Sequence, residues 1–264
     1  MKNIKLIASD VDGTLLPEGS ADINPEIFEI IRKLRERGIL FVAASGRHYS
    51  SMERLFEPVK DDMIFIASNG AYVCQNGNTI QECLLDWENV SRWVRDVRQI
   101  PGSSFVMDTK EGFYTESMDA EFMDRMQSGY RNNIIWLEDI LAQKRKVSKL
   151  GIYQKENRGE TVAFLILRWK NRLCCVRSGK AWLDFMSPGT NKGSALQELQ
   201  KKWGISPDET MVFGDNENDL EMFLSASESY AVGNAAQAVI NAARYTTDTN
   251  VNDGVLKVLR TLLD

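Results

Sequence analysis

Two aspartates lie two positions apart in the stretch SDVDGTLL at 9–16, directly after the apolar run IKLIA at 4–8. The run is rich in aliphatic and β-branched residues and has the length of a buried strand, so Asp10 is expected where a strand ends. If the extended backbone continues through Asp12, the two-residue period of a strand places both carboxylates on the same side. Two like charges in one small volume are unfavourable unless a cation lowers their repulsion or one of them carries a proton. The stretch therefore predicts a metal site or acid–base chemistry.

Polar groups also follow other predicted strands. Ser45 and Gly46 follow the run ILFVAA, and Asp215 follows MVF as Asp10 follows IKLIA. Because ligands of open α/β sheets bind outside the carboxyl ends of the strands, we expect these groups to converge. A cluster of carboxylates suits Mg2+, which prefers hard oxygen ligands and keeps some coordination positions for substrate phosphate and water.

Lys192 stands at the expected start of a helix, where the positive end of the helix macrodipole disfavours a cation. A bound phosphate reverses that preference, because the helix N-terminus and the ammonium then both attract the anion. Acidic groups with Mg2+, a lysine and a hydroxyl cradle are what phosphoryl transfer requires, since positioning and charge neutralisation supply most of its catalysis.

These groups depend on strands and helices at both ends of the chain. Asn24 and Pro25 are typical of a helix start, and the apolar spacing after them predicts a helix that ends at Gly38. Strands over ILFVAA and MIFIA alternate with helices, and the rhythm resumes after Gly189 with a helix from Gly193 and the strands TMVFGD and SYAV. This alternation predicts an α/β fold with a Rossmann-like, doubly wound parallel sheet.

The middle of the chain differs in character. AYVCQ and TIQECLL flank Asn76-Gly77 and predict a hairpin with a type I′ turn, while SFVMDT and GFYTES predict a second hairpin. A helix is expected to carry Trp87, Trp93 and Val97, and the basic run KRKVSK at 144–149 looks like the solvated end of another helix. We therefore expect a core of 1–78 and 188–264 with an inserted α+β domain at 79–187.

Composition excludes several classes of protein. The 264 residues are 43% hydrophobic and 26% charged, which is ordinary for a globular protein with a sizeable core. No apolar run reaches the roughly 18 residues that span a bilayer, and the short N-terminal run does not predict a signal peptide. A formal charge of −5 argues against nucleic-acid binding, and four cysteines without CxxC spacing favour reduced thiols in a cytoplasm. We expect a cytoplasmic protein whose partner is a small molecule, with its oligomeric state open.

The motifs together resemble the haloacid dehalogenase (HAD) superfamily of phosphohydrolases, and within it the Cof-type phosphatases with a class IIB cap. Four motifs carry the resemblance in chain order: DVDGTLL at 10–16, SGR at 45–47, TNKG at 190–193 and GDNEND at 214–219. Three further stretches extend it over the core: SNGA at 68–71, GNAA at 233–236 and NDGV at 252–255.

The resemblance implies a Mg2+-dependent hydrolase of small phosphate monoesters, sugar phosphates above all, that works through an aspartyl-phosphate. It implies that Asp10 is the nucleophile and that Asp12 protonates the leaving group and later activates water. The implied metal ligands are the Asp10 carboxylate, the Asp12 main-chain carbonyl and Asp215. The implied phosphate ligands are the Val11 amide, Ser45, Gly46, Lys192 and Asn218. In the same scheme Asp219 orients the other groups, Thr14 orients Asp12, and Gly13 permits the sharp turn.

Alternatives stay open at this stage. A phosphosugar mutase shares the fold and the aspartyl-phosphate, but it needs a second anion site of clustered Arg or Lys in the cap. A non-catalytic phospholigand sensor is expected to lack at least one charged residue of the set Asp10, Asp12, Lys192 and Asp215, and all are present. Arg47 could contact substrate or close the sheet edge, and the mechanism requires no role for His48. No stretch of the cap identifies the substrate.

Overall fold

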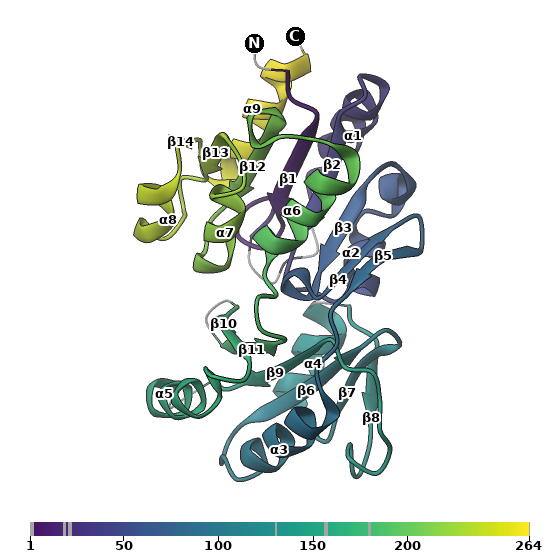
Figure 1. Cartoon of the computed structure of the whole chain (residues 1–264), viewed down its shortest axis with the longest axis vertical. Helices are drawn as coiled ribbons and strands as arrows, with labels where there is room; N and C mark the ends of the chain where they lie inside the picture. The colour runs from purple at the N-terminus through teal and green to yellow at the C-terminus, as the bar shows by residue number, and fades with distance from the viewer. Residues whose placement is uncertain are drawn as a thin grey trace. The chain divides into compact units, whose positions relative to one another are not determined.

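The computed structural model describes residues 3–17, 20, 23–129, 131–155, 158–178 and 181–263. Within these limits the chain divides into two compact units, Met1–Gln81 with Asn191–Asp264, and Glu82–Thr190. The first unit therefore contains both ends of the chain, and Figure 1 shows purple and yellow segments side by side within it.

The first unit is built on a sheet in the order β14-β13-β12-β1-β2-β3-β4-β5. Its strands are Leu6–Asp10 (β1), Leu40–Ala44 (β2), Ile64–Ala67 (β3), Tyr72–Gln75 (β4), Asn78–Glu82 (β5), Thr210–Gly214 (β12), Glu228–Ala231 (β13) and Tyr245–Thr246 (β14). Pairing is parallel from β14 to β3, and β4 then runs antiparallel to β3. The first strand therefore lies inside the sheet, flanked by β12 and β2, where the strand order changes direction (Figure 1).

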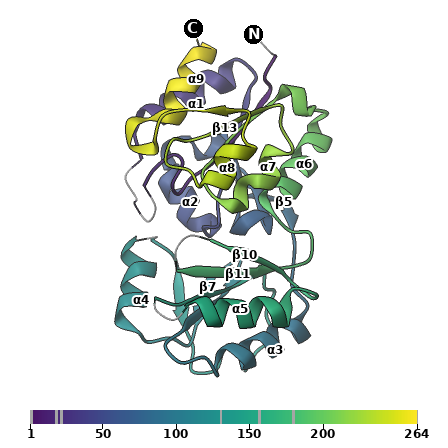
Figure 2. The same cartoon turned by 90° about the vertical axis from the view of Figure 1, so that its left-hand side faces the viewer.

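Helices cover both faces of this sheet. They are Glu26–Glu36 (α1), Tyr49–Leu55 (α2), Lys192–Trp203 (α6), Leu220–Phe223 (α7), Gln237–Ala242 (α8) and Gly254–Leu263 (α9), with short 3-10 turns at Glu57–Asp62, Ser68–Gly70, Pro207–Glu209, Glu217–Asp219 and Asn250–Asn252. One apolar core joins α1, α2 and α9 to the strand face that carries Ile7 and Phe41, and a second joins α6, α7 and α8 to the face that carries Leu6 and Val42. Figure 2 shows α6, α7 and α8 together in front of the sheet. The predicted doubly wound α/β fold is confirmed.

Local sequence explains where these elements begin and turn. The Asn24 Oδ1 accepts the backbone N–H of Glu26 at 3.0 Å, and the helix buries the apolar positions that its spacing predicts. Asn76 and Gly77 have φ angles of 50° and 70°, the left-handed conformation that a type I′ turn between β4 and β5 requires. The first predicted hairpin is therefore present.

The second unit is an α+β layer with strand order β10-β11-β9-β6-β7-β8. Its strands are Ser104–Thr109 (β6), Gly112–Thr115 (β7), Ile134–Trp136 (β8), Lys149–Tyr153 (β9), Cys174–Arg177 (β10) and Trp182–Met186 (β11). Its helices are Trp87–Val97 (α3), Ala120–Asp124 (α4) with a π turn at Arg125–Gly129, and Arg158–Trp169 (α5). Trp93 of α3, Leu165 of α5 and Phe185 of β11 share one core, and Figure 2 shows α3 and α5 in this unit. The predicted β6–β7 hairpin and the helix with Trp87, Trp93 and Val97 are both present.

The basic run at 144–149 differs from its prediction. Residues 144–147 are irregular chain that leads into β9, so the run does not end a helix. Lys149 is buried with its Nζ 3.1 Å from Asp184 Oδ2, and the Arg145 guanidinium carbon lies 4.5 Å from the centre of the Tyr114 ring. A solvated run was therefore the wrong interpretation at these two positions, because each cation has a partner far along the chain.

The states of the cysteines and the lengths of the helices can be compared with the sequence-based expectations. All four cysteines, Cys74, Cys83, Cys174 and Cys175, are free thiols, as predicted. Among the described residues, no helix combines the length and the apolar character needed to cross a membrane.

Candidate active site

The carboxyl ends of neighbouring strands bring the predicted polar groups together. Asp10 ends β1, Ser45 follows β2, and Asp215 follows β12. The parallel register pairs Asp10 with Ala44 on one side and Ser9 with Phe213 on the other, so these strand ends lie at the same edge. The expected convergence is confirmed, and it follows from the parallel pairing of strands that end in polar residues.

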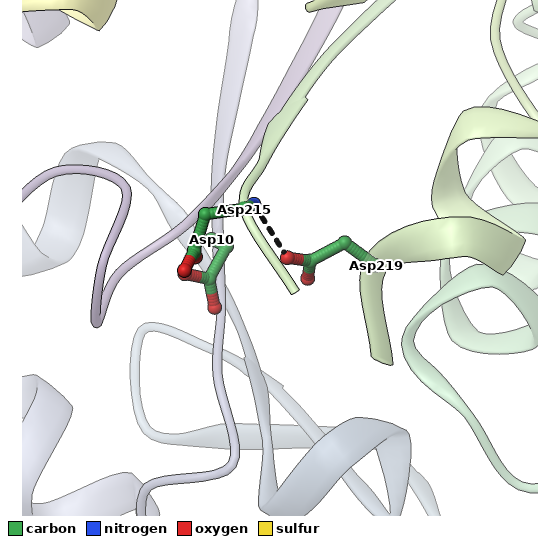
Figure 3. A group of neighbouring side chains, drawn as sticks. All are labelled: Asp10, Asp215 and Asp219. Atoms are coloured by element: carbon green, nitrogen blue, oxygen red, sulfur yellow. Dashed lines mark hydrogen bonds between the residues drawn. The ribbon is translucent and has the colours of Figure 1, made fainter. Parts of the chain in front are cut away.

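Three carboxylates gather at this edge. One oxygen from each of Asp10, Asp215 and Asp219 lies within 4.8 Å of the other two (Figure 3). Asp219 Oδ2 accepts the backbone N–H of Asp215 at 3.0 Å, the dashed line in Figure 3, and that of Asn216 at 3.1 Å. The turn after β12 therefore fixes the Asp219 carboxylate from within its own loop.

Lys192 neutralises part of this charge. Its Nζ lies 2.6 Å from Asp10 Oδ1 and 2.7 Å from Asp219 Oδ1, and its side chain is completely buried. Asn191 places it at the first position of α6, because the Asn191 side chain accepts the Ser194 N–H at 2.7 Å and caps the helix. Burial alone would lower the pKa of Lys192, but Asp10 and Asp219 together raise it, so the ammonium is retained.

The cluster favours a further cation. Burial raises the pKa of Asp10 well above its ordinary value, Lys192 opposes the rise, and the charges of Asp219 and Asp215 add to it. Burial and the Asp219 charge also raise the pKa of Asp215, to about 6, against a hydrogen bond from Thr14. These shifts mean that the carboxylate charges are incompletely compensated, which a bound divalent cation would correct.

The donor set fits Mg2+ chemically. All the clustered ligand atoms are carboxylate oxygens, the hard donors that this ion prefers. Asp10 Oδ2 is buried and accepts no hydrogen bond from any residue that the structure describes. A buried carboxylate oxygen in that state is costly unless a cation occupies its lone pairs, so it supports a metal at this position.

Asp12 lies apart from the three-carboxylate cluster. The strand ends at Asp10, and a turn follows in which the Gly13 N–H donates to Leu16 O at 2.7 Å with Gly13 φ at 89°. Asp12 itself forms an isolated parallel bridge with Leu16, just beyond the end of β1. Its carboxylate instead binds Arg47, with Nε 2.7 Å from Oδ2 and Nη2 2.6 Å from Oδ1. Neither role considered for Arg47 from the sequence included this contact.

Thr14 also has a different partner from the one predicted. Its Oγ1 donates to Asp215 Oδ1 at 2.8 Å, and no described hydrogen bond joins it to Asp12. The Gly13 turn explains the change, because it brings the chain against Asp215: a Cβ on Gly13 would lie 2.3 Å from Asp215 Oδ2. The loop after β1 thus holds the Asp215 carboxylate of the loop after β12.

The predicted phosphate ligands lie on four segments, the loops after β1, β2 and β12 and the start of α6. Ser45 Oγ accepts the Arg47 N–H at 3.0 Å and lies 3.4 Å from Asp12 Oδ2. Asn218 Nδ2 donates to Asn69 Oδ1 at 3.0 Å, and the Asn69 carboxamide also lies against Gly46. Val11 is buried in the turn after β1, with its carbonyl accepting the N–H of Leu15 at 3.0 Å.

Two asparagines and a histidine complete the local structure. His48 Nδ1 accepts the Ser50 N–H at 3.1 Å and caps α2, a structural contact. Asn234 Nδ2 donates to Gly13 O at 2.8 Å while its Oδ1 accepts the Asn250 N–H at 2.8 Å, so it supports the turn after Asp12. No role for Asn234 was predicted from the sequence, although it lies in the stretch GNAA that carried the resemblance, and Asn69-Gly70 in SNGA was expected either to form a turn or to face the substrate.

Family, sequence and structure comparisons all match this chain to haloacid dehalogenase-like hydrolases and phosphatases. Residues 7–259 match the family model described as haloacid dehalogenase-like hydrolase. The chain is 29% identical over 262 residues to 5-amino-6-(5-phospho-D-ribitylamino)uracil phosphatase YbjI of Escherichia coli, covering 99% of this chain and 97% of that protein. A crystal structure from Eubacterium rectale is 33% identical, with a TM-score of 0.86 over 98% of this chain and 99% of that one. The fold is also shared with a HAD subclass IIB sugar phosphatase, at 22% identity and a TM-score of 0.83 over 98% of each chain.

Proposed function

Since the chain belongs to the family of haloacid dehalogenase-like hydrolases, we propose that it is a Mg2+-dependent phosphatase of small phosphate monoesters that works through an aspartyl-phosphate. The resemblance found in the sequence is confirmed by the family match. The observation that carries the proposal is the position of Asp10. Its Oδ1 binds the buried Lys192 ammonium, and its Oδ2 accepts no hydrogen bond from the described residues. That arrangement suits a nucleophile that works beside a cation.

The chemistry follows from two carboxylates in unequal surroundings. Asp10 attacks the phosphorus, the bond from phosphorus to the leaving oxygen breaks, and Asp12 gives that oxygen a proton. Asp12 then takes a proton from water as the water attacks the aspartyl-phosphate, which releases inorganic phosphate and restores Asp10. Arg47 holds Asp12 outside the three-carboxylate cluster, so the two aspartates have different partners, as their different roles require.

Residues of this chain are available to hold the ion and the phosphate. The Asp10 and Asp215 carboxylates and the Asp12 carbonyl are the proposed Mg2+ ligands, with Thr14 and Asp219 orienting them. When bound, the ion supplies positive charge that offsets the repulsion between the carboxylates and the phosphate. The Val11 amide, Ser45, Gly46, Lys192 and Asn218 are the proposed phosphate ligands, on loops that meet at one sheet edge.

The substrate class rests on the relatives. The Escherichia coli relative is named for a substrate whose phosphate is carried on a ribitylamino chain attached to a uracil. The resemblance implies sugar phosphates, and both kinds of compound carry phosphate on a polyhydroxylated carbon chain. We therefore infer that the substrate is a phosphate monoester of a sugar or a sugar alcohol, with or without an attached heterocycle.

Hydrolysis is favoured over the mutase reaction by the second unit. A mutase must bind a second phosphate, which calls for clustered Arg or Lys. In the one dense basic run, Lys149 pairs with Asp184 and Arg145 lies over Tyr114, so these cations already have partners. Because Lys149 and Arg145 already have partners, this run does not supply the second phosphate site of a mutase, which supports transfer of the phosphate to water.

A panel of phosphate monoesters tests the proposal. Enzyme and Mg2+ are incubated with hexose, pentose and ribitol phosphates and with a phosphorylated ribitylamino-pyrimidine, and both free phosphate and isomers are measured. Phosphate release that disappears in the Asp10→Asn variant is the expected result. Isomer formation without free phosphate would replace the hydrolase by the mutase, and no reaction with any ester would reject the proposed function.

A further inference from the structure

The residues after β3 have an unusual backbone. Ser68, Asn69 and Gly70 follow one another with φ angles of 51°, 55° and 97°. For a residue with a side chain this left-handed conformation is unfavourable, and it persists only where the surroundings impose it. Asn69 is 1% exposed and Ser68 2% exposed, so the segment is buried as well as strained. Such strain is concentrated at functional sites, which raises the question of what this segment holds.

Asn69 contacts two of the loops proposed to bind phosphate. Its backbone N–H donates to Ser45 O at 2.9 Å, and a Cβ on Gly46 would lie 3.2 Å from its Nδ2. Its Oδ1 accepts the Asn218 Nδ2 at 3.0 Å, across 149 residues of sequence. The backbone of Asn69 therefore fixes the loop after β2, and its side chain fixes the loop after β12.

The neighbours of Asn69 extend these contacts to the residue before α6, next to Lys192. A Cβ on Gly70 would lie 2.2 Å from Asn191 O, so only glycine permits this approach to the residue before Lys192. The Ser68 N–H donates to Arg47 O at 2.9 Å. One short segment thus contacts the loops that carry Ser45, Lys192 and Asn218.

From this convergence we propose that Asn69 is a positioning residue, which orients the Asn218 amide and the Ser45–Gly46 turn for phosphate binding. The inference rests on the proposed phosphatase function. By accepting one N–H of the Asn218 amide, Asn69 fixes the rotation of that amide and so the direction of its other N–H. An aspartate at 69 could accept the same hydrogen bond, but its charge would repel the phosphate. A neutral acceptor orients Asn218 without that cost.

Two asparagines with similar backbones provide a matched comparison. Glycine adopts a positive φ without strain, so Asn69→Gly removes the carboxamide and leaves the backbone conformation available. Asn76 has a φ of 50° in the exposed turn between β4 and β5, and Asn76→Gly removes a carboxamide there. The two substitutions are chemically identical and differ in the burial of the side chain and in its contact with Asn218.

The decisive experiment is a double-mutant cycle with Asn218→Ala. Steady-state kinetics with the best ester of the panel is combined with calorimetric titration of inorganic phosphate in the presence of Mg2+. We expect Asn69→Gly to lower kcat/KM and phosphate affinity by about 10- to 100-fold, while Asn76→Gly stays within about twofold of the wild type. Because Asn69 acts through Asn218, the double variant should lose no more than about twofold beyond Asn218→Ala.

Several results would overturn the inference. Asn69→Gly within twofold of the wild type would remove any role for the side chain, and losses that multiply in the double variant would make Asn69 act independently of Asn218. If Asn69→Gly does not fold, Asn69→Asp is the second variant, because it retains the hydrogen-bond acceptor for Asn218. Its negative charge is expected to weaken phosphate binding by repulsion. An unchanged affinity of this variant for phosphate would contradict the proposal. A wild type that binds no phosphate overturns it too. A wild type that binds phosphate but hydrolyses no ester rejects the proposed function alone, since the binding cycle still tests Asn69.

Discussion

The Arg47 guanidinium holds both oxygens of the Asp12 carboxylate, at 2.7 Å from Nε to Oδ2 and 2.6 Å from Nη2 to Oδ1. The Arg47 side chain is only 4% exposed, and its Nη2 also donates to Ser20 O at 2.7 Å. A planar fork that binds two oxygens fixes both the position and the plane of a carboxylate. The direction of the proposed acid and base therefore depends on a residue of the loop after β2.

We expect Arg47→Lys to lower kcat by about tenfold and Arg47→Ala by about a hundredfold, because proton transfer depends on the orientation of Asp12. Lysine keeps the charge but cannot reproduce the two-oxygen contact. KM should change less than kcat, since Arg47 is not among the proposed phosphate ligands. Steady-state kinetics gives both constants.

A second bidentate arginine in the same unit is the control. Arg260 binds the two oxygens of Glu26 at 2.8 Å and 2.7 Å on the surface, so Arg260→Lys breaks the same geometry away from Asp12. Its kcat should equal that of the wild type. An Arg47→Ala variant that folds and keeps the wild-type kcat would show that Asp12 needs no such support.

Asp10→Asn should abolish turnover, to below about 1% of the wild-type rate, because it removes the attacking charge. The fold should persist, since Lys192 keeps its contact with Asp219 at 2.7 Å and one buried negative charge is lost. Circular dichroism and the thermal midpoint without Mg2+ report on the fold, and phosphate release reports on turnover. Residual activity of several per cent in a pure preparation would assign the nucleophile elsewhere.

The stability of the metal-free protein should increase as the pH falls from 7 to 5. The folded state raises the pKa of Asp215 to about 6 from an ordinary 3.8, through burial first and the Asp219 charge second, so it binds more protons than the unfolded state in this interval. The free energy of unfolding therefore decreases as pH rises through the interval, by about 1 kcal/mol for this group. Asp10, whose pKa is also raised by burial, contributes in the same direction. Urea unfolding at several pH values in the presence of a chelator measures the slope.

Mg2+ and Asp215→Asn isolate the cause of that slope. The ion favours the ionised carboxylates, so it should stabilise the protein more at pH 7 than at pH 5. Asp215→Asn should flatten the metal-free profile because its side chain does not titrate. Equal slopes for this variant and the wild type would exclude Asp215 as the source.

The sequence was sufficient for the features that follow from strands and parallel pairing. Asp10 and Asp215 could be placed together because each follows an apolar run, and the carboxyl ends of parallel strands meet at one edge. The same reasoning does not extend to Asp12 and Thr14. Both lie beyond the end of β1, next to the turn at Gly13, and their hydrogen-bond partners belong to the loops after β2 and β12, which the period of one strand does not identify.

Contacts between distant residues explain the other differences. Arg47 lies 35 residues from Asp12, and Asn69 lies 149 residues from Asn218, so no local pattern pairs them. In the sequence, Lys149 is one member of a charged run. Its buried ion pair with Asp184, 35 residues further along the chain, is visible only in the structure. Local composition predicts exposure for such a lysine, and tertiary structure overrides it.

Gly13→Ala should disrupt the metal site specifically, and Gly38→Ala tests whether backbone strain alone could do so. Both glycines have positive φ, 89° and 75°, so alanine incurs a similar backbone cost at each. A Cβ at position 13 would lie 2.3 Å from Asp215 Oδ2, whereas a Cβ at position 38 has no atom within 4 Å. We therefore expect Gly13→Ala to raise the Mg2+ concentration needed for half-maximal activity by at least about tenfold, while Gly38→Ala loses only about 1 kcal/mol of stability with unchanged Mg2+ dependence. Equal Mg2+ dependence in the two variants would mean that the turn at Gly13 does not position Asp215.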